Sequence, residues 1–246
     1  MKIVVTGGSR GIGRLIVGDL IKEHEVIVVS KSKESTDRIK DELGVKAYSA
    51  DVTDYLEIEK TFRKIGSFDA LINCAGVLGP VGPISQTDMK QWKKTLDVNL
   101  IGTVNCCKAA ISHMSGKGKI INLSGGGAAY PRIYHSAYAA SKAAVVRFTE
   151  NLAQDLLHDG TKVAVNVVAP GAHKTDLWGG ETFDEEPGQW ADPQLLFKLI
   201  RFLLSKESDG VNGRFIHIKD DYLNFDKSDQ DMFTMRRIDD FKYRRK

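Results

Sequence analysis

Lys2-Ile3-Val4-Val5-Thr6-Gly7-Gly8-Ser9-Arg10-Gly11-Ile12-Gly13 opens the chain and decides its fold. The first residues are apolar and β-branched, as in a buried strand, and leucine and isoleucine recur at helical spacing after the last glycine. A strand, a glycine-rich turn and a helix start can hold a pyrophosphate, because free N–H groups and the helix dipole attract an anion there. The glycine spacing matches neither G-x-G-x-x-G nor the P-loop. The stretch predicts a nucleotide site, and the alternative is a βα turn that binds nothing.

The rest of the chain alternates between strand-like and helix-like segments. Repeated βα units of this kind predict a parallel sheet with helices on both faces. In such a sheet, ligands bind beyond the carboxyl ends of the strands. The expected strands are residues 25–30, 46–50, 68–74, 119–123, 163–168 and 215–218, and the expected helices are 33–43, 54–65, 89–114 (one or two helices), 138–158 and 193–205.

The composition limits the classes of function. A chain of 246 residues with 42% hydrophobic residues suits one α/β domain, and a net charge of +3 does not favour a nucleic-acid partner. Cys74, Cys106 and Cys107 form an odd set without metal-ligand spacing, so we expect no disulfide framework, no metal site and a cytoplasmic location. No apolar run reaches the length of a membrane span, and the first strand leaves no room for a signal peptide.

Several short motifs fall where this sheet should bind its ligand. They are the glycine turn, Asp51-Val52, Asn73-Cys74-Ala75-Gly76, Asn99, Tyr138-Ala139-Ala140-Ser141-Lys142 and Pro170-Gly171. With these motifs, over roughly residues 2–218, the chain resembles the short-chain dehydrogenase/reductase family, in particular NADP-dependent carbonyl and 3-oxoacyl reductases. The resemblance implies a single Rossmann-type domain with a doubly wound parallel sheet in the order 3-2-1-4-5-6-7. It also implies an oxidoreductase that transfers hydride between NADPH and a ketone or aldehyde, or the corresponding alcohol.

Tyr138 and Lys142 are the main catalytic candidates. They are four residues apart, so on a helix they share one face. A free tyrosine pKa near ~10 is too high for easy proton exchange at neutral pH. A nearby lysine cation, together with the positive ring of the oxidised cofactor, would lower the tyrosine pKa. The resemblance implies that Tyr138 exchanges the proton with substrate. It implies that Lys142 holds the nicotinamide ribose and shares a proton relay with Asn99.

The fourth catalytic residue of the family departs from the pattern here. The family usually has a serine thirteen residues before the tyrosine, and this position is Gly125, with Ser124 one residue earlier. Three explanations remain open. The loop could hold one extra residue, so that Ser124 takes the serine's role; backbone N–H groups of Gly125-Gly126-Gly127 could supply the hydrogen bond; or catalysis could be weak or absent.

The end of the second strand indicates the cofactor. NAD enzymes usually carry an acidic residue there, whereas this chain has Ser30-Lys31-Ser32, and Arg10 stands in the glycine turn. Basic residues at these positions suit the 2′-phosphate of NADP, so we expect NADPH to be preferred over NADH. The resemblance implies further contacts to the cofactor from Gly7, Ser9, Gly11, Ile12, Gly13, Asp51, Val52, Asn73, Ala75, Gly76, Pro170, Gly171 and Thr175.

Two segments have no fixed role in the sequence. Residues 176–190 carry three aromatic residues among acidic ones and could form either an apolar lid or a local cluster. Residues 219–246 form an extension beyond the catalytic domain 1–218, and it is too apolar for a simple disordered tail. We expect this extension to pack on the domain or on a neighbouring subunit.

The substrate is a small molecule that the sequence does not identify. The resemblance implies a homodimer or homotetramer, and no membrane partner is expected. Two alternatives to a reductase remain open. One is a non-catalytic dinucleotide-binding sensor or scaffold, which Gly125 favours; the other is a sugar-modifying relative such as an epimerase.

Overall fold

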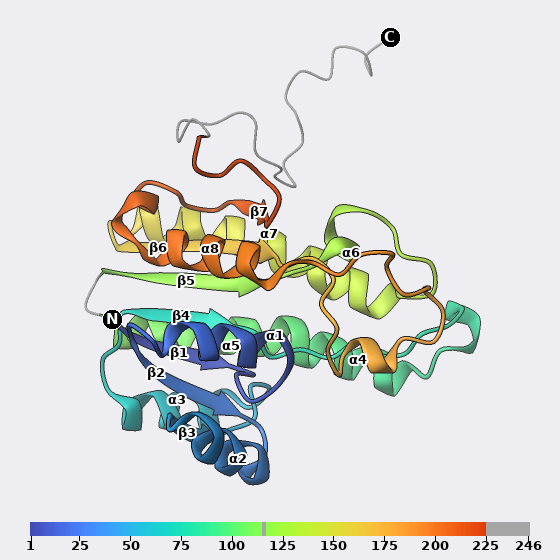
Figure 1. The fold of residues 1–246 in the computed structure, drawn as a ribbon, viewed down its shortest axis with the longest axis horizontal. Helices are drawn as coiled ribbons and strands as arrows, with labels where there is room; N and C mark the ends of the chain where they lie inside the picture. The colour runs from blue at the N-terminus through green and yellow to red at the C-terminus, as the bar shows by residue number, and fades with distance from the viewer. Residues whose placement is uncertain (115–116, 225–246) are drawn as a thin grey trace.

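The computed structural model describes residues 1–114 and 117–224, and the expected packing of the tail beyond residue 224 lies outside them. Seven strands form one parallel sheet in the order β3-β2-β1-β4-β5-β6-β7, which confirms the predicted fold class and strand order (Figure 1). The strands are β1 (Lys2–Thr6), β2 (Glu25–Ser30), β3 (Lys46–Ser49), β4 (Ala70–Asn73), β5 (Lys117–Leu123), β6 (Lys162–Ala169) and β7 (Phe215–His217).

The helices connect these strands and cover both faces of the sheet. The predicted helical segment 89–114 is two helices joined by a π-helical turn, Asp97–Ile101. The helices are α1 (Gly11–Leu20), α2 (Lys33–Leu43), α3 (Tyr55–Ile65), α4 (Met89–Leu96), α5 (Gly102–His113), α6 (Gly126–Ala129), α7 (Ser136–His158) and α8 (Pro193–Leu204). In the described ranges 1–114 and 117–224, no helix is both long and apolar enough to cross a membrane.

Local signals in the sequence fix the helix ends. Asp54 caps α3, because its carboxylate accepts hydrogen bonds from two free N–H groups of the first turn, at 2.9 and 3.1 Å. Asp192 caps α8 in the same way, and a proline follows it at the first helical position. At the end of α2, Gly44 adopts the left-handed conformation (φ 66°) that ends a helix most easily.

The side chains of β1 show how the two cores arise. Ile3 and Val5 point into one apolar layer, which α1 and α8 cover, and Val4 points into the other, which α3 and α5 cover. All three side chains are fully buried. A strand that is apolar on both faces therefore lies in the middle of a parallel sheet.

The strand order places the ligand site. β1 pairs with β2 on one side and with β4 on the other, so the chain turns in opposite directions on the two sides of β1. At such a reversal the loops that follow neighbouring strands diverge and leave a crevice at their carboxyl ends. The glycine turn after β1 and the loop after β4 both start at this point.

Candidate active site

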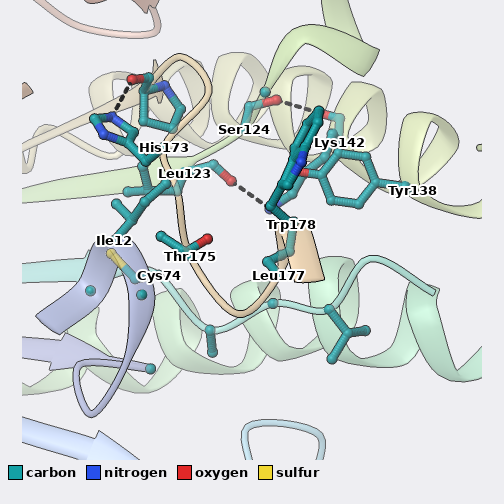
Figure 2. Close-up of a pocket in the computed structure, with 18 of the residues that line it drawn as sticks. Ile12, Cys74, Leu123, Ser124, Tyr138, Lys142, His173, Thr175, Leu177 and Trp178 are labelled. Carbon is teal, nitrogen blue, oxygen red and sulfur yellow. Dashed lines mark hydrogen bonds between the residues drawn. The ribbon is translucent and has the colours of Figure 1, made fainter. Parts of the chain in front are cut away.

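A cavity of about 1330 Å³ lies at the carboxyl ends of the strands. It extends from the glycine turn to the start of α7 and the loop after β6, and Figure 2 shows part of its wall. Nearly all of the predicted site residues line it. These are Gly7, Ser9, Arg10, Gly11, Ile12, Gly13, Ser30, Lys31, Ser32, Asp51, Val52, Ala75, Gly76, Ser124, Tyr138, Lys142, Pro170, Gly171 and Thr175.

The glycine turn leaves no room for side chains. Gly7 has φ 66°, and a Cβ there would lie 2.6 Å from the backbone of Ala75. A Cβ on Gly13 would lie 2.3 Å from the carbonyl oxygen of Gly7. Thr175 closes the turn from the other side, since a Cβ on Gly11 would lie 3.6 Å from its Cβ. The turn therefore presents backbone rather than side chains to the cavity, at the start of α1.

Polar and charged groups gather at the end of β2. The Ser30 hydroxyl is buried at the cavity and has no hydrogen-bond partner in the described part of the chain. Lys31 forms an ion pair with Asp51 at 2.6 Å, although the lysine side chain stays 72% exposed. Burial acts to raise the pKa of Asp51, but the hydrogen bonds from Lys31 and Thr53 prevail and lower it. The Ser32 hydroxyl caps α2, where it accepts a bond from Ser35 N–H at 3.2 Å.

Two predicted residues do not line the cavity, and Asn73 is the first. Its side-chain amide donates to Asn122 Oδ1 at 2.9 Å and accepts from the Thr6 hydroxyl at 3.2 Å. Asn73 is 3% exposed, so these bonds satisfy a buried amide between β1, β4 and β5. The side chain of Asn73 therefore takes part in the hydrogen bonds of the sheet.

Asn99 is the second, and it lies behind Gly76. Its amide exchanges two hydrogen bonds with the backbone of Val77, at 2.8 and 2.9 Å, and donates to the Ser141 hydroxyl at 3.0 Å. A Cβ on Gly76 would lie 3.3 Å from Asn99 Oδ1 and 3.7 Å from Lys142 Nζ. The π-helical turn, a feature frequent at functional sites, thus brings Asn99 close to the lysine.

Lys142 and Tyr138 stand one turn apart on α7, as the spacing predicts. The buried ammonium of Lys142 donates to the Leu123 carbonyl at 2.9 Å and lies 5.7 Å from the centre of the Tyr138 ring (Figure 2). Burial lowers the pKa of Lys142 to about 8. Burial also raises the pKa of Tyr138, and the guanidinium of Arg132 acts against this rise. The shift of the Tyr138 pKa is opposite to the lowering expected from the sequence. In the protein alone, the desolvation of the phenol outweighs the charge of the nearby Arg132.

Position 125 and Ser124 differ in what they face. A Cβ on Gly125 would lie 3.2 Å from the Tyr138 hydroxyl, so position 125 itself faces the tyrosine. The Ser124 hydroxyl instead donates to the Lys142 carbonyl at 3.0 Å, and the serine is 3% exposed. Ser124 therefore supports the backbone of α7.

Comparison with known proteins decides the family. The model of the short chain dehydrogenase family matches residues 1–186. The chain belongs to the short-chain dehydrogenase family. It is 30% identical to meso-2,3-butanediol dehydrogenase from Serratia marcescens, over 88% of this chain and 92% of that one. It is 32% identical to carbonyl reductase family member 4 from Xenopus laevis, over 86% and 93%. A gluconate 5-dehydrogenase structure from Burkholderia cenocepacia, solved with NADP and tartrate, is 26% identical with a TM-score of 0.79 and coverage of 88% and 92%.

This short-chain dehydrogenase is therefore an NAD(P)-dependent oxidoreductase of small molecules. Its own residues fit a dinucleotide. The turn at Gly7 and Gly13 presents bare backbone to a phosphate, and the unpartnered Ser30 hydroxyl offers a hydrogen bond at the other end of the cavity. Because Gly76 has no side chain, the space next to Lys142 Nζ is open, and a ribose that contacts the lysine needs this space.

The loop after β6 closes the cofactor half of the cavity. The His173 ring bonds to the Pro170 carbonyl at 2.8 Å, and burial lowers the histidine pKa (Figure 2). The His173 ring therefore stabilises the backbone of this loop. Further along, Trp178 and Phe183 line the cavity, and Trp190 packs edge-on against Trp178 at 5.3 Å. The aromatic residues thus form both a wall of the site and a local cluster.

An ion cluster, which the sequence analysis missed, ties this aromatic segment to the loop before α7. Arg132 donates to Glu181 at 2.9 Å and to Asp184 at 2.5 Å, and His135 lies 2.6 Å from the same Glu181 carboxylate. Burial acts to raise the pKa of Glu181, but backbone N–H groups of residues 183 and 184, together with His135, hold it at about 2. The residues lie almost fifty positions apart, so no spacing in the sequence could reveal the pairing.

The same cluster has the donor types of a metal site, since His135, Glu181 and Asp184 offer atoms within 4.8 Å of one another. The guanidinium of Arg132 already donates to both carboxylates. It also lies 5.7 Å from the centre of the Tyr138 ring. The guanidinium of Arg132 thus balances the charge of a buried Glu181 carboxylate and a partly exposed Asp184 carboxylate, and we call this cluster an ionic clamp.

Proposed function

We propose that this enzyme reduces a ketone or aldehyde with NADPH, or oxidises the corresponding alcohol, and that Tyr138 exchanges the proton. The observation that carries the proposal is the position of the Tyr138 hydroxyl. It lies on the cavity wall beside Gly125, has no hydrogen-bond partner in the described residues, and stands one turn from a buried ammonium. A polar hydroxyl left unpaired in a pocket is available to a ligand atom.

NADPH supplies the hydride, a proton with two electrons, to the carbonyl carbon. We assign Tyr138 to give its proton to the carbonyl oxygen, so that the C=O bond becomes a C–OH bond and the tyrosine is left as a phenolate. Lys142 stabilises that phenolate by its charge, and the missing side chain at Gly76 leaves its Nζ open to a ribose. Asn99, which lies against Gly76 with Lys142, then belongs to the path by which the proton returns.

The preference for NADPH rests on the cations around the end of β2. Arg10, Lys31 and Arg38 line the cavity, and Arg10 and Arg38 have no acidic partner in the described residues. In the ion pair between Lys31 and Asp51 the lysine side chain is 72% exposed, so solvent screens its attraction to the carboxylate. A 2′-phosphate can therefore compete with Asp51 for Lys31. The structural neighbour from Burkholderia cenocepacia holds NADP, which supports the same choice.

The substrate half of the cavity favours a neutral, largely apolar carbonyl compound. Its wall includes Tyr130, Ile133, Trp178 and Phe183. Arg132, a cation in the loop before α7 that lines the cavity, is neutralised by two carboxylates. An anionic substrate would have to displace these acids, whereas an apolar ketone needs only to cover the aromatic rings. The name of one relative, a butanediol dehydrogenase, is consistent with a small uncharged substrate.

We further expect a homodimer or homotetramer that works in the cytoplasm, without nucleic-acid or membrane partners. Support for a reducing compartment comes from three free thiols, of which Cys106 and Cys107 are fully buried. The catalytic domain is taken to span residues 1–218. Tyr222 of the following segment packs against Phe202 with a distance of 5.2 Å between the ring centres, so residue 222 lies against α8.

The proposal is tested by oxidation of NADPH and of NADH with the purified protein. The panel contains acetophenone, 2,3-butanedione, ethyl acetoacetate and a keto-sugar, and Tyr138→Phe is the control. We expect turnover with NADPH that the Phe variant loses by about a hundredfold or more, because the proton donor is gone. Equal turnover by the variant would refute the assignment of Tyr138.

Gly125 supports one second candidate, a dinucleotide-binding protein without catalysis. A serine side chain is missing at the position that faces the Tyr138 hydroxyl. If NADPH binds tightly and no carbonyl in the panel is reduced, this candidate replaces the reductase.

A further inference from the structure

The wall opposite the cofactor loops has two consecutive glycines that face two different tyrosines. A Cβ on Gly125 would lie 3.2 Å from the hydroxyl oxygen of Tyr138. A Cβ on Gly126 would lie only 2.2 Å from the hydroxyl oxygen of Tyr130 and 2.6 Å from its Cζ. The two tyrosine hydroxyls therefore approach neighbouring points of the same backbone.

Tyr130 can occupy this place because residue 126 is a glycine. A contact of 2.2 Å is far inside any van der Waals distance, so an alanine at position 126 would push the phenol away. A backbone hydrogen bond also holds Tyr130 next to Gly126, since the Tyr130 N–H donates to the Gly126 carbonyl at 3.0 Å. The glycine at position 126 thus leaves the space that the Tyr130 phenol occupies, next to a position 125 that carries no side chain.

The Tyr130 hydroxyl is free to bind a ligand. It lines the cavity, the residue is 60% exposed, and the hydroxyl has no hydrogen-bond partner within the described ranges. It also lies close enough to Tyr138 to contribute to the raised pKa of that phenol. The other side-chain donors near Tyr138 are engaged, since Ser124 donates to a backbone carbonyl and Arg132 to two carboxylates.

We infer that Tyr130 supplies the hydrogen bond that a serine at position 125 would give, so that the substrate oxygen binds between the hydroxyls of Tyr130 and Tyr138. The inference rests on the proposed carbonyl reduction. Two donors at one carbonyl oxygen polarise the C=O bond and stabilise the negative charge that develops on it. The proton that leaves Tyr138 ends on the substrate oxygen, and Tyr130 keeps its own proton throughout.

A phenol also explains how the site tolerates the loss of a small hydroxyl. A serine at position 125 would reach the substrate from the backbone beside Tyr138, whereas the Tyr130 hydroxyl stands at the end of a ring that begins at the residue after α6. The ring adds an apolar surface to the pocket that a serine lacks. The arrangement therefore suits a substrate with an apolar group next to its carbonyl, such as an aryl ketone.

The test compares three tyrosine variants of the full-length enzyme with acetophenone as the probe. Tyr130→Phe removes only the hydroxyl, and Tyr134→Phe is the matched control. Tyr134 lies in the same loop, outside the cavity lining, and its ring packs on Phe183 at 4.5 Å. We expect Tyr130→Phe to lower kcat for NADPH-dependent reduction by about a hundredfold, as loss of one oxyanion donor does. Tyr134→Phe should stay within about twofold of the wild type.

A second readout does not depend on turnover. Acetophenone binds the enzyme with NADP⁺ as a dead-end complex, which quenching of tryptophan fluorescence reports, because Trp178 lines the cavity. Loss of one hydrogen bond should raise the Kd of acetophenone about tenfold in Tyr130→Phe and leave it unchanged in Tyr134→Phe. Thermal unfolding of each variant checks that the fold is intact.

A rescue makes the inference specific. Gly125→Ser in the Tyr130→Phe background returns a hydroxyl to the position beside Tyr138. The double variant should have a kcat at least about tenfold higher than that of Tyr130→Phe alone. Gly126→Ala, which displaces the Tyr130 phenol, should lower kcat in the wild type and change little in Tyr130→Phe, because both changes remove the same contact.

The outcomes separate this inference from the proposed function. If Tyr138→Phe loses turnover while Tyr130→Phe matches Tyr134→Phe in both readouts, the inference is overturned and the reductase stands; the donor is then the backbone of Gly125-Gly126-Gly127. If the wild type neither reduces nor binds any carbonyl of the panel, the proposed function fails and this inference fails with it.

Discussion

The glycine turn allows a sharp prediction, because the same helix offers a matched pair of glycines. In Gly13→Ala the new methyl lies 2.3 Å from the carbonyl oxygen of Gly7 and 3.1 Å from Gly8 Cα, and both are backbone atoms. In Gly18→Ala nothing lies within 4 Å of the new methyl. Both residues belong to α1, so the two variants make the same substitution in the same helix and differ only in the space around the new methyl group.

The magnitudes follow from these distances. Replacing glycine by alanine inside a helix stabilises the folded state by about 0.5–1 kcal/mol, and this is the whole expected effect of Gly18→Ala. In Gly13→Ala the overlap with the Gly7 carbonyl is more than ~1 Å against an optimal contact near ~3.5 Å. Overpacking of this kind costs about 1–3 kcal/mol. Because both variants gain the same helix stabilisation, they should differ by the overpacking cost of about 1–3 kcal/mol, or roughly 2–12 °C in Tm for a chain of this size.

The assay is thermal unfolding at one protein concentration, with and without NADPH, followed by titration of NADPH. Gly18→Ala should melt slightly above the wild type and bind NADPH normally. Gly13→Ala should melt below it and bind NADPH at least about tenfold more weakly, because the displaced carbonyl moves the N–H groups that face the phosphates. If Gly13→Ala matches Gly18→Ala in both measurements, the reasoning about close approach in the turn is refuted.

Three further predictions concern the charged groups of the cavity. Arg10→Ala with Lys31→Ala should reduce the preference for NADPH over NADH at least tenfold in kcat/KM, whereas Arg14→Ala, which removes only an exposed pair with a glutamate, should leave it unchanged. Glu181→Gln should lower the free energy of unfolding by about 3 kcal/mol at pH 7, because its neighbours hold the pKa of Glu181 at about 2 against an ordinary 4.5. This loss of stability should shrink as the pH falls from 4.5 towards 2, because the wild-type carboxylate then becomes protonated. Urea unfolding of both proteins at several pH values measures the difference. Because burial lowers the pKa of Lys142 to about 8, reductase activity should fall as the pH rises through that value, and Lys142→Arg should remove this limb of the pH profile if the cation is what matters.

The sequence predicted those parts of the molecule that depend on local patterns. The apolar β-branched runs and the glycine turn identified the strands and the start of α1, and the four-residue spacing of Tyr138 and Lys142 placed both on one face of α7. Polar motifs directly after strands also lay at one edge of the sheet, since all strands are parallel. These signals act over a few residues, so composition and spacing were sufficient.

The features that the sequence did not predict depend on the orientation of side chains and on contacts between residues that are far apart in the sequence. Asn73 follows a strand as a ligand contact would, yet its amide turns inward to Asn122, and nothing in the spacing distinguishes the two orientations. The clamp between Arg132 and Glu181 joins residues 49 positions apart in two irregular loops. The raised pKa of Tyr138 reflects desolvation, which depends on how the finished pocket covers the ring.

The central claim is direct transfer of hydride to a carbonyl carbon with Tyr138 as the proton donor. The most direct measurement incubates the enzyme and acetophenone with NADPH that carries deuterium at one of its two C4 positions, each in turn, and analyses the alcohol by mass spectrometry. The account predicts one deuterium on the carbinol carbon from one of the two labelled forms, and a rate at least about a hundredfold lower in Tyr138→Phe. An alcohol without deuterium from either form, or equal rates for the two proteins, would contradict it.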